Sequence, residues 1–255
     1  MGGRPAALHP FSRPHRRPAV RSFAVTDRGF ARSSNQDAAY VRSLSGTELL
    51  VVADGMGGLP AGDRASALVI AAFERPPAED EAPDRYLRDA VRRARRAIDD
   101  GVARHLERTG MGSTVVAAVV RSGEAWVAHV GDSRAYLWQD GELRQLTEDH
   151  TVAAEAARGG QLDPRLVRAD PGRHLLTRVV GGAAADPDLR GPLPLDGSSA
   201  LLLVTDGVCG VIDDDRIAEA LAERRGAAIA SELIARVHAA GAPDNIGIAL
   251  LDERV

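Results

Sequence analysis

The sequence has no lysine, a single cysteine and no long apolar run. All 32 of its basic residues other than histidine are arginine, which excludes lysine nucleophiles and Schiff-base chemistry. The lone Cys209 excludes an internal disulfide and a thiolate metal cage. Because free cysteine is typical of a reducing compartment, we expect a cytoplasmic protein. Arg, Asp or Gly interrupts every hydrophobic stretch before it reaches the roughly 20 residues of a membrane span, so no membrane segment is predicted.

The composition is that of an ordinary globular protein. The chain has 255 residues, of which 44% are hydrophobic and 27% charged, with a net charge of -4. These values exclude a disordered polymer and a collagen, and they give no reason to expect a nucleic-acid partner. Residues 1–20 are rich in Pro and Arg and lack the apolar core of a secretory signal, so we expect a disordered basic arm. An anion-binding tail is an alternative interpretation of this arm. One domain is predicted over 21–255.

Apolar periodicity predicts a mixture of strands and helices. Helical spacing marks residues 65–72, 87–98, 215–223 and 226–240. Six short Val- and Leu-rich runs have the length of strands: ELLVVA, STVVAAVV, EAWVAHV, RAYLW, ALLLVT and IGIALL. Asp140-Gly141 joins two apolar runs as a hairpin turn would. Clustered strands and paired helices favour an α+β protein with antiparallel sheets and helices packed outside them.

Residues 147–176 show no clear period and contain two Asp-Pro steps. A segment of this length without regular structure is often a functional lid in a compact domain. An ordinary surface insertion explains the same features equally well.

Aspartate recurs where apolar strands end. Asp54 follows LLVVA, Asp206 follows LLLVT, and Asp244 lies just before IGIALL. Asp-Gly is a common turn dipeptide. The residues after Asp54 and Asp206, however, are small and do not lead into the second strand of a hairpin. Carboxylates that meet at one sheet rim repel one another unless cations neutralise them, and oxygen ligands favour Mg²⁺ or Mn²⁺. Zinc is disfavoured because the histidines are scattered and no Cys pair exists.

Other catalytic signatures are missing from the sequence. It contains no phosphate-binding loop, no GxSxG elbow and no dinucleotide fingerprint. The chemistry that remains is hydrolysis of a phosphate or acyl substrate by metal-activated water.

Taken together, these features resemble the metal-dependent protein phosphatases, the protein phosphatase 2C family, in their compact bacterial form. Eight stretches carry the resemblance in family order: TDRGFARSSNQDA (26–38), VVADGMGGLPAGDRAS (51–66), MGSTVVAAVV (111–120), AHVGDSRAYLW (128–138), LTEDH (146–150), LLTRVVGG (175–182), LLVTDG (202–207) and PDNIGIALL (243–251). The resemblance implies an α/β/β/α sandwich of four layers, with a metal cleft at one end and residues 147–176 as a flap beside it.

The resemblance also implies roles for particular residues, which we state as expectations. Two Mn²⁺ or Mg²⁺ ions are expected in the core site, with Asp54 bridging them, the Gly55 carbonyl binding one, and Asp206 and Asp244 completing the other. Asp37 is expected to hold metal-bound water.

Two further residues complete the implied site. Arg32 is expected to grip the substrate phosphate, for which its guanidinium fork is suited. Asp132 is expected to bind a weaker third metal. The implied reaction is attack of metal-activated water on phosphoserine or phosphothreonine, with no covalent enzyme intermediate.

The sequence departs from the family pattern at three positions near the expected site. Gln36 replaces a frequent Glu, Met56 replaces a histidine proposed as the leaving-group acid, and Gly210 stands where relatives often supply another carboxylate. Met56 cannot donate a proton, and Gly210 weakens the case for the third metal. Thr114 matches a family position near the site, where we expect strand packing only.

The leading hypothesis is a monomeric serine/threonine protein phosphatase that opposes a protein kinase and binds neither nucleic acid nor membrane. One alternative is a phosphoprotein-binding pseudophosphatase that has lost its chemistry. Another is a metal-dependent hydrolase of small phosphorylated molecules, because the fold does not fix the substrate.

Overall fold

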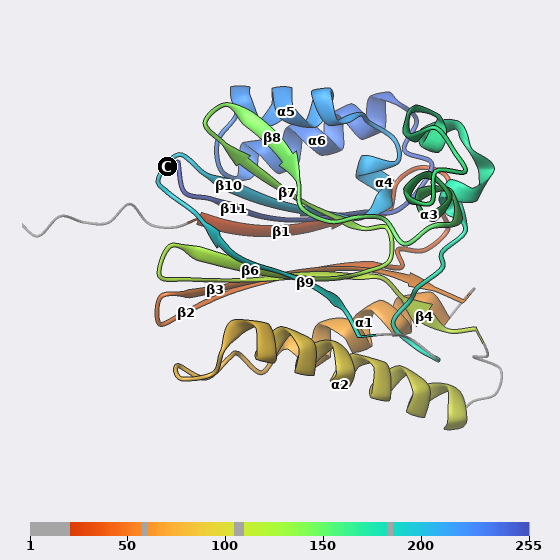
Figure 1. Cartoon of the computed structure of the whole chain (residues 1–255), viewed down its shortest axis with the longest axis horizontal. Helices are drawn as coiled ribbons and strands as arrows, with labels where there is room; N and C mark the ends of the chain where they lie inside the picture. The colour runs from red at the N-terminus through yellow and green to blue at the C-terminus, as the bar shows by residue number, and fades with distance from the viewer. Residues whose placement is uncertain (1–20, 58–60, 105–109, 183–185, 255) are drawn as a thin grey trace, which may run out of the picture.

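The computed structural model describes residues 21–57, 61–104, 110–182 and 186–254. In these ranges two antiparallel sheets are stacked face to face, and helices cover both outer faces (Figure 1). The predicted α+β sandwich of four layers is therefore confirmed. The arm predicted over residues 1–20 lies outside the described residues.

The first sheet has the strand order β1-β11-β10-β7-β8. Its strands are β1 (Arg21–Asp27), β11 (Ile246–Asp252), β10 (Ala200–Val204), β7 (Arg134–Gln139) and β8 (Glu142–Gln145). The predicted hairpin joins β7 to β8, and Asp140 and Gly141 have φ angles of 54° and 84°. Two consecutive positive φ angles are what a tight two-residue hairpin turn requires. The helices over this sheet are α4 (Asp206–Cys209), α5 (Asp214–Glu223) and α6 (Ala227–Ala239).

The second sheet has the order β2-β3-β5-β6-β9, and the short β4 pairs with the end of β3. Its strands are β2 (Asp37–Leu44), β3 (Thr47–Met56), β4 (Gly112–Ser113), β5 (Val115–Arg121), β6 (Glu124–Val130) and β9 (Asp188–Pro194). Helices α1 (Ala61–Phe73) and α2 (Pro83–Arg104) cover its outer face (Figure 1).

The apolar runs are continuous because both faces of the central strands are buried. Successive side chains of a strand point to opposite faces. On β3, Leu50 and Val52 pack between the two sheets, whereas Leu49 and Val51 pack under α1 and α2. The side chains of β10 alternate in the same way, and Leu201 packs between the two sheets. The strand ends are thereby held rigidly, and the residues that follow them lie at a fixed rim.

Residues 147–176, called the flap below, contain more local structure than the sequence indicated. Helix α3 (Val152–Arg158) begins at Thr151, whose side chain accepts a hydrogen bond from the Ala154 amide. Two 3₁₀ helices follow, η2 (Pro164–Ala169) and η3 (Pro171–His174). The flap packs at the end of the sandwich near α4 (Figure 1). Among the described residues, no helix combines the length and the apolar character that crossing a membrane demands.

Candidate metal centre

The two sheets bring the strand-end carboxylates to one rim. Asp54 lies near the end of β3 and is paired in register with Asp37 at the start of β2. In the other sheet, Asp206 follows β10 and Asp244 precedes β11. Repulsion from nearby carboxylates, Asp244 in each case, adds to burial in raising the pKa of Asp37, of Asp54 and of Asp206. The structure therefore gathers the aspartates that the sequence singled out.

Burial and repulsion from like charges make the carboxyl groups of Asp37, Asp54, Asp132 and Asp206 hard to ionise. Burial is the main cause and raises the pKa of Asp37 to about 7, of Asp206 to about 6 and of Asp132 to about 8. It also raises the pKa of Asp54 well above its ordinary value, with repulsion from Asp37 as the next cause. Like charges in a buried site persist only if cations compensate them.

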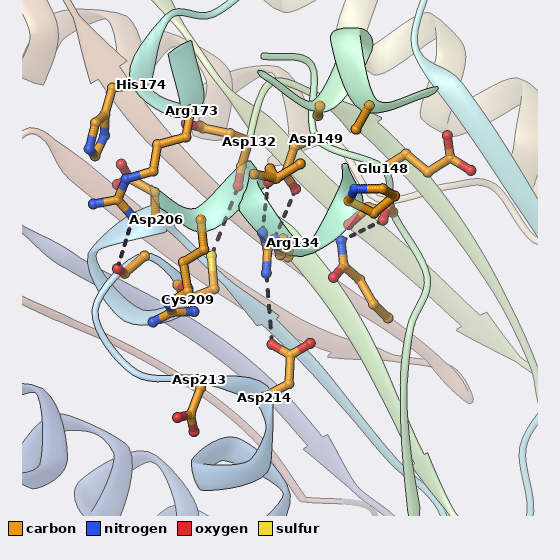
Figure 2. Close-up of a pocket in the computed structure, with 18 of the residues that line it drawn as sticks. Asp132, Arg134, Glu148, Asp149, Arg173, His174, Asp206, Cys209, Asp213 and Asp214 are labelled. Atoms are coloured by element: carbon orange, nitrogen blue, oxygen red, sulfur yellow. Dashed lines mark hydrogen bonds and ion pairs between the residues drawn. The ribbon is translucent and has the colours of Figure 1, made fainter. Parts of the chain in front are cut away.

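The donor set fits hard divalent cations. Carboxylate oxygens dominate the cluster, which suits Mn²⁺ or Mg²⁺ and disfavours softer metals. The backbone of Gly55 is fixed beside it, because the Gly55 amide donates to the Gln36 carbonyl at 3.0 Å. A Cβ atom at position 55 would lie 1.8 Å from the Gly62 carbonyl oxygen, so only glycine fits. Asp132 joins the cluster from the turn before β7, where it faces Asp206 (Figure 2).

Arg32 lies at the mouth of the cluster. Its Nη2 donates to Oδ2 of Asp244 at 2.7 Å, and its side chain is 52% exposed. This hydrogen bond raises the pKa of the guanidinium, which keeps its charge. The guanidinium is thus both close to the carboxylates and accessible to a ligand, as a phosphate-binding arginine must be.

Two threonines that sequence reasoning missed or undervalued hold the cluster in place. Thr205 Oγ1 donates to Oδ2 of Asp37 at 2.6 Å and accepts from the Gly247 amide at 2.8 Å. Thr114 Oγ1 accepts from the Asp54 amide at 3.0 Å and lies 2.7 Å from the hydroxyl of Ser133. The expectation of strand packing only for Thr114 is therefore wrong, because its hydroxyl links the end of β3 to the loop before β7. The only sequence signal for Thr205 is its place beside Asp206.

The three positions that depart from the family pattern lie beside the carboxylate cluster. Met56 is 39% exposed at the end of β3, where it has no proton to donate. The Gln36 side chain lies against Gly62. The Gly210 amide donates to the Asp206 carbonyl at 2.7 Å, and a Cβ atom there would lie 2.6 Å from that oxygen. Position 210 therefore supplies no carboxylate to the cluster.

A cavity of about 770 Å³ opens beside Asp132 and Asp206. The flap forms one wall, and the start of α5 forms another, where the Asp214 side chain points toward Arg134 (Figure 2). Cys209 lines it but is buried, and burial raises the pKa of its thiol, which disfavours the reactive thiolate. The cavity places room for a larger ligand next to the carboxylate cluster.

The flap is tied to the rest of the molecule at both ends. Near its start, Asp149 accepts two hydrogen bonds from Arg134, both at 2.8 Å. At its far side, Arg168 and Arg173 reach the carbonyls of Cys209 and Gly210 at 3.4 Å each. The first tie is a charged bidentate pair and the second is a pair of long contacts, so the second tie is the weaker of the two.

A second group of ligand-type side chains lies where the start of the flap meets β6 and β9. Ring nitrogens of His129 and His150 and a carboxylate oxygen of Asp188 lie within 4.8 Å of one another. The Gly131 amide donates to Nδ1 of His150, and Nε2 of His150 lies 2.9 Å from Oδ2 of Asp188. The Arg178 guanidinium also contacts both groups. This arrangement is an ion-pair network that joins the flap to β9, and the positive charge of Arg178 opposes a metal there.

Comparison with known proteins gives consistent matches over most of the chain. A family model described as Protein phosphatase 2C matches residues 31–232. The serine/threonine protein phosphatase PstP of Mycobacterium tuberculosis is 35% identical over 237 residues, which cover 91% of this chain and 45% of that protein. The chain thus spans less than half the length of that relative. The serine/threonine phosphatase stp of Listeria monocytogenes is 31% identical, over 89% of this chain and 93% of that protein.

Solved structures agree with the fold and with the nature of the site. The crystal structure of M. tuberculosis PstP matches with a TM-score of 0.84 and 35% identity, covering 91% of this chain and 98% of that chain. A structure of the PstP catalytic domain in complex with two manganese ions matches with a TM-score of 0.81 and 34% identity, covering 91% and 97%.

Proposed function

The chain belongs to the protein phosphatase 2C family, and on that premise we propose that it hydrolyses phosphoserine and phosphothreonine in proteins with the help of two divalent cations. The observation that carries the proposal is the gathering of Asp37, Asp54, Asp206 and Asp244 at one rim with Arg32 at its mouth. Partly buried carboxylates beside an open cavity, three of them with raised pKa values, are typical of a catalytic site.

The residues that would hold the cations are Asp54, the Gly55 carbonyl, Asp206 and Asp244, with Asp132 as the ligand of a weaker third ion. When bound, two such cations lower the pKa of water and neutralise charge on phosphoryl oxygens. The named relative with two manganese ions supports this assignment.

The protein's own groups would orient the reactants. Arg32 presents a planar fork of donors that can bind two phosphoryl oxygens, once its hydrogen bond to Asp244 is exchanged for the substrate. Thr205 fixes the carboxyl group of Asp37 through Oδ2, and Asp37 would hold the water that the cations bind. Positioning of this kind accounts for much of the rate in phosphoryl transfer. Met56 takes no part in proton transfer.

The decisive test measures phosphate release from a phosphothreonine peptide. The purified protein is assayed with excess Mn²⁺, with Mg²⁺, and with EDTA. We expect release that depends on the cation and is abolished by EDTA. Hydrolysis of phosphorylated metabolites but not of peptides would favour the small-molecule alternative. Binding of the peptide without release, in excess Mn²⁺, would favour the pseudophosphatase.

The finer assignments are also part of the proposal. A phosphatase of this specificity requires a serine/threonine kinase that supplies its substrates, and we propose that the protein opposes one as a monomer. The buried free thiol of Cys209 supports a reducing, cytoplasmic setting.

We further propose that the flap selects phosphoprotein substrates. It forms a wall of the 770 Å³ cavity next to Asp206, where residues flanking a phosphoresidue would lie. Replacing residues 160–170 with a Gly-Ser linker leaves the Arg134–Asp149 pair and the His150 network in place. We expect kcat/KM for a phosphopeptide to fall roughly 10-fold, because a wall of the peptide site is lost.

The control for the flap replacement is a small aryl phosphate, which reaches the carboxylate cluster without contacting the flap. Its kcat/KM is expected to change less than about 3-fold. If the replacement left the turnover and the preference among phosphopeptides unaltered, the flap would have no role in selecting substrates.

A further inference from the structure

The loop that carries Arg32 is held by hydrogen bonds to one buried side chain, that of Asn245. This arginine loop, residues 28–36, joins β1 to β2. Asn245, which lies just before β11, is 4% exposed. Its Nδ2 donates to the carbonyls of Arg28 and Ser34 at 2.8 Å and 2.9 Å, and its Oδ1 accepts from the Gln36 amide at 2.8 Å.

These three hydrogen bonds use the whole carboxamide of Asn245. Both Nδ2 protons are donated to carbonyls, and Oδ1 faces an amide donor, so the orientation of the group is unambiguous. The bonded positions flank Arg32 on both sides, at residue 28 and at residues 34 and 36. One side chain thereby fixes the path of the loop before and after the arginine.

The backbone around Asn245 approaches the same loop closely. The Phe30 amide donates to the Ala242 carbonyl at 2.9 Å. Gly29 has a φ of +69°, and a Cβ atom there would lie 2.2 Å from the Asp244 carbonyl oxygen. The arginine loop therefore packs directly against the segment that carries Asp244. Asn245 is the side chain that holds the loop in this position.

We propose that Asn245 is a positioning residue that aims Arg32 at the phosphoryl group. The inference rests on the proposed function and deepens it, because it assigns the substrate-binding geometry of Arg32 to a residue that touches neither phosphate nor metal. Aspartate at position 245 would keep the acceptor for Gln36 and lose both donors. The carbonyls of Arg28 and Ser34 would then face a carboxylate, and the loop would detach.

The kinetic test compares Asn245→Ala, Asn245→Asp and Arg32→Ala. We expect each to raise the KM of a phosphothreonine peptide by roughly 10-fold or more, with kcat changed much less, because phosphate binding is weakened. The double variant Arg32→Ala/Asn245→Ala is expected to be no worse than Arg32→Ala alone, since a positioning residue has no effect once its target is gone. Effects that multiply in the double variant would overturn the proposal.

A structural readout separates this role from general stability. Amide hydrogen exchange of residues 28–36 should quicken in Asn245→Ala and Asn245→Asp. The matched control is Ser199→Ala. Ser199 lies just before the first residue of β10, and the substitution removes a buried hydroxyl that is hydrogen-bonded to Asp196. It should lower stability without altering KM or exchange in the arginine loop.

The outcomes distinguish the two proposals. If the wild-type protein released no phosphate with Mn²⁺, the proposed function would fail, while the exchange experiment would still decide whether Asn245 holds the loop. If the wild type were active and Asn245→Ala kept its KM or its slow exchange, the role of Asn245 would be refuted. Should Asn245→Ala not fold, the isosteric Asn245→Asp carries the same comparison.

Discussion

Asp206→Asn is expected to lower turnover of a phosphothreonine peptide by about 1000-fold without unfolding the protein. Asp206 follows the buried strand β10, and its carboxylate faces Asp244 and Asp132. The substitution keeps the shape of the side chain and removes one negative ligand charge, so a divalent cation loses an anionic oxygen. Because the wild-type carboxylate is partly buried and repelled by nearby carboxylates, the metal-free variant should be at least as stable as the metal-free wild type.

The matched control for this substitution is Asp213→Asn. Asp213 lines the same cavity, but its side chain caps α5 by accepting from the Arg216 amide at 3.0 Å. Asparagine caps helices as well as aspartate does, so we expect turnover within about 3-fold of wild type. Phosphate release with Mn²⁺, together with thermal unfolding in EDTA, measures both effects. Wild-type turnover in Asp206→Asn would refute the assignment of the metal centre.

The fold could be predicted from the sequence where buried strands produce uninterrupted apolar runs. Runs such as ELLVVA and ALLLVT become β3 and β10, which are covered on both faces. Strands β1, β2 and β9 were not predicted, because β1 and β2 are only partly buried and β9 contains Gly191 and Pro192. Their pairing partners lie far away in the sequence, as Arg21 opposite Asp252 shows, and periodicity does not report such pairs.

Some residues of the candidate site could likewise be predicted from the sequence, and others could not. Asp54, Asp206 and Asp244 could be found because each borders a recognisable strand. Arg32 and Asp132 were expected only from the family motifs. Thr205 and Asn245 could not be found, because their roles consist of hydrogen bonds to segments more than 160 residues away, with separations of 168 and 209. The flap remained ambiguous because short helices such as α3 and η2 are stabilised by their contacts and have no period of their own.

Removing the metal should make stability fall as pH rises from about 6.5 to 8.5. In the unfolded chain, the carboxyl groups have lost their protons by pH 6.5. In the folded, metal-free protein, Asp37 and Asp132 keep protons up to pKa values of about 7 and about 8. The folded state then binds more protons than the unfolded state, so its free energy of unfolding decreases with pH, by roughly 2–3 kcal/mol over this window.

The window is chosen so that histidine does not obscure the effect. Burial lowers the pKa of His129 to about 3 and also lowers that of His150. A lowered histidine pKa increases stability as pH rises, but this contribution is nearly complete above the unfolded value of about 6.5. Between pH 6.5 and 8.5 the carboxylate cluster therefore dominates the slope.

Saturating Mn²⁺ or Mg²⁺ should reverse this slope, because cations bind the deprotonated cluster and compensate its charge. The gain in unfolding temperature on adding metal to EDTA-treated protein should thus be larger at pH 8.5 than at pH 6.5, by several degrees for a chain of this size. Asp206→Asn, with one charge fewer in the cluster, should show a smaller difference between the two pH values. A metal-free protein whose stability was flat or rose across this window would mean that the carboxylates ionise without a cation, and the electrostatic case for a metal centre would fail.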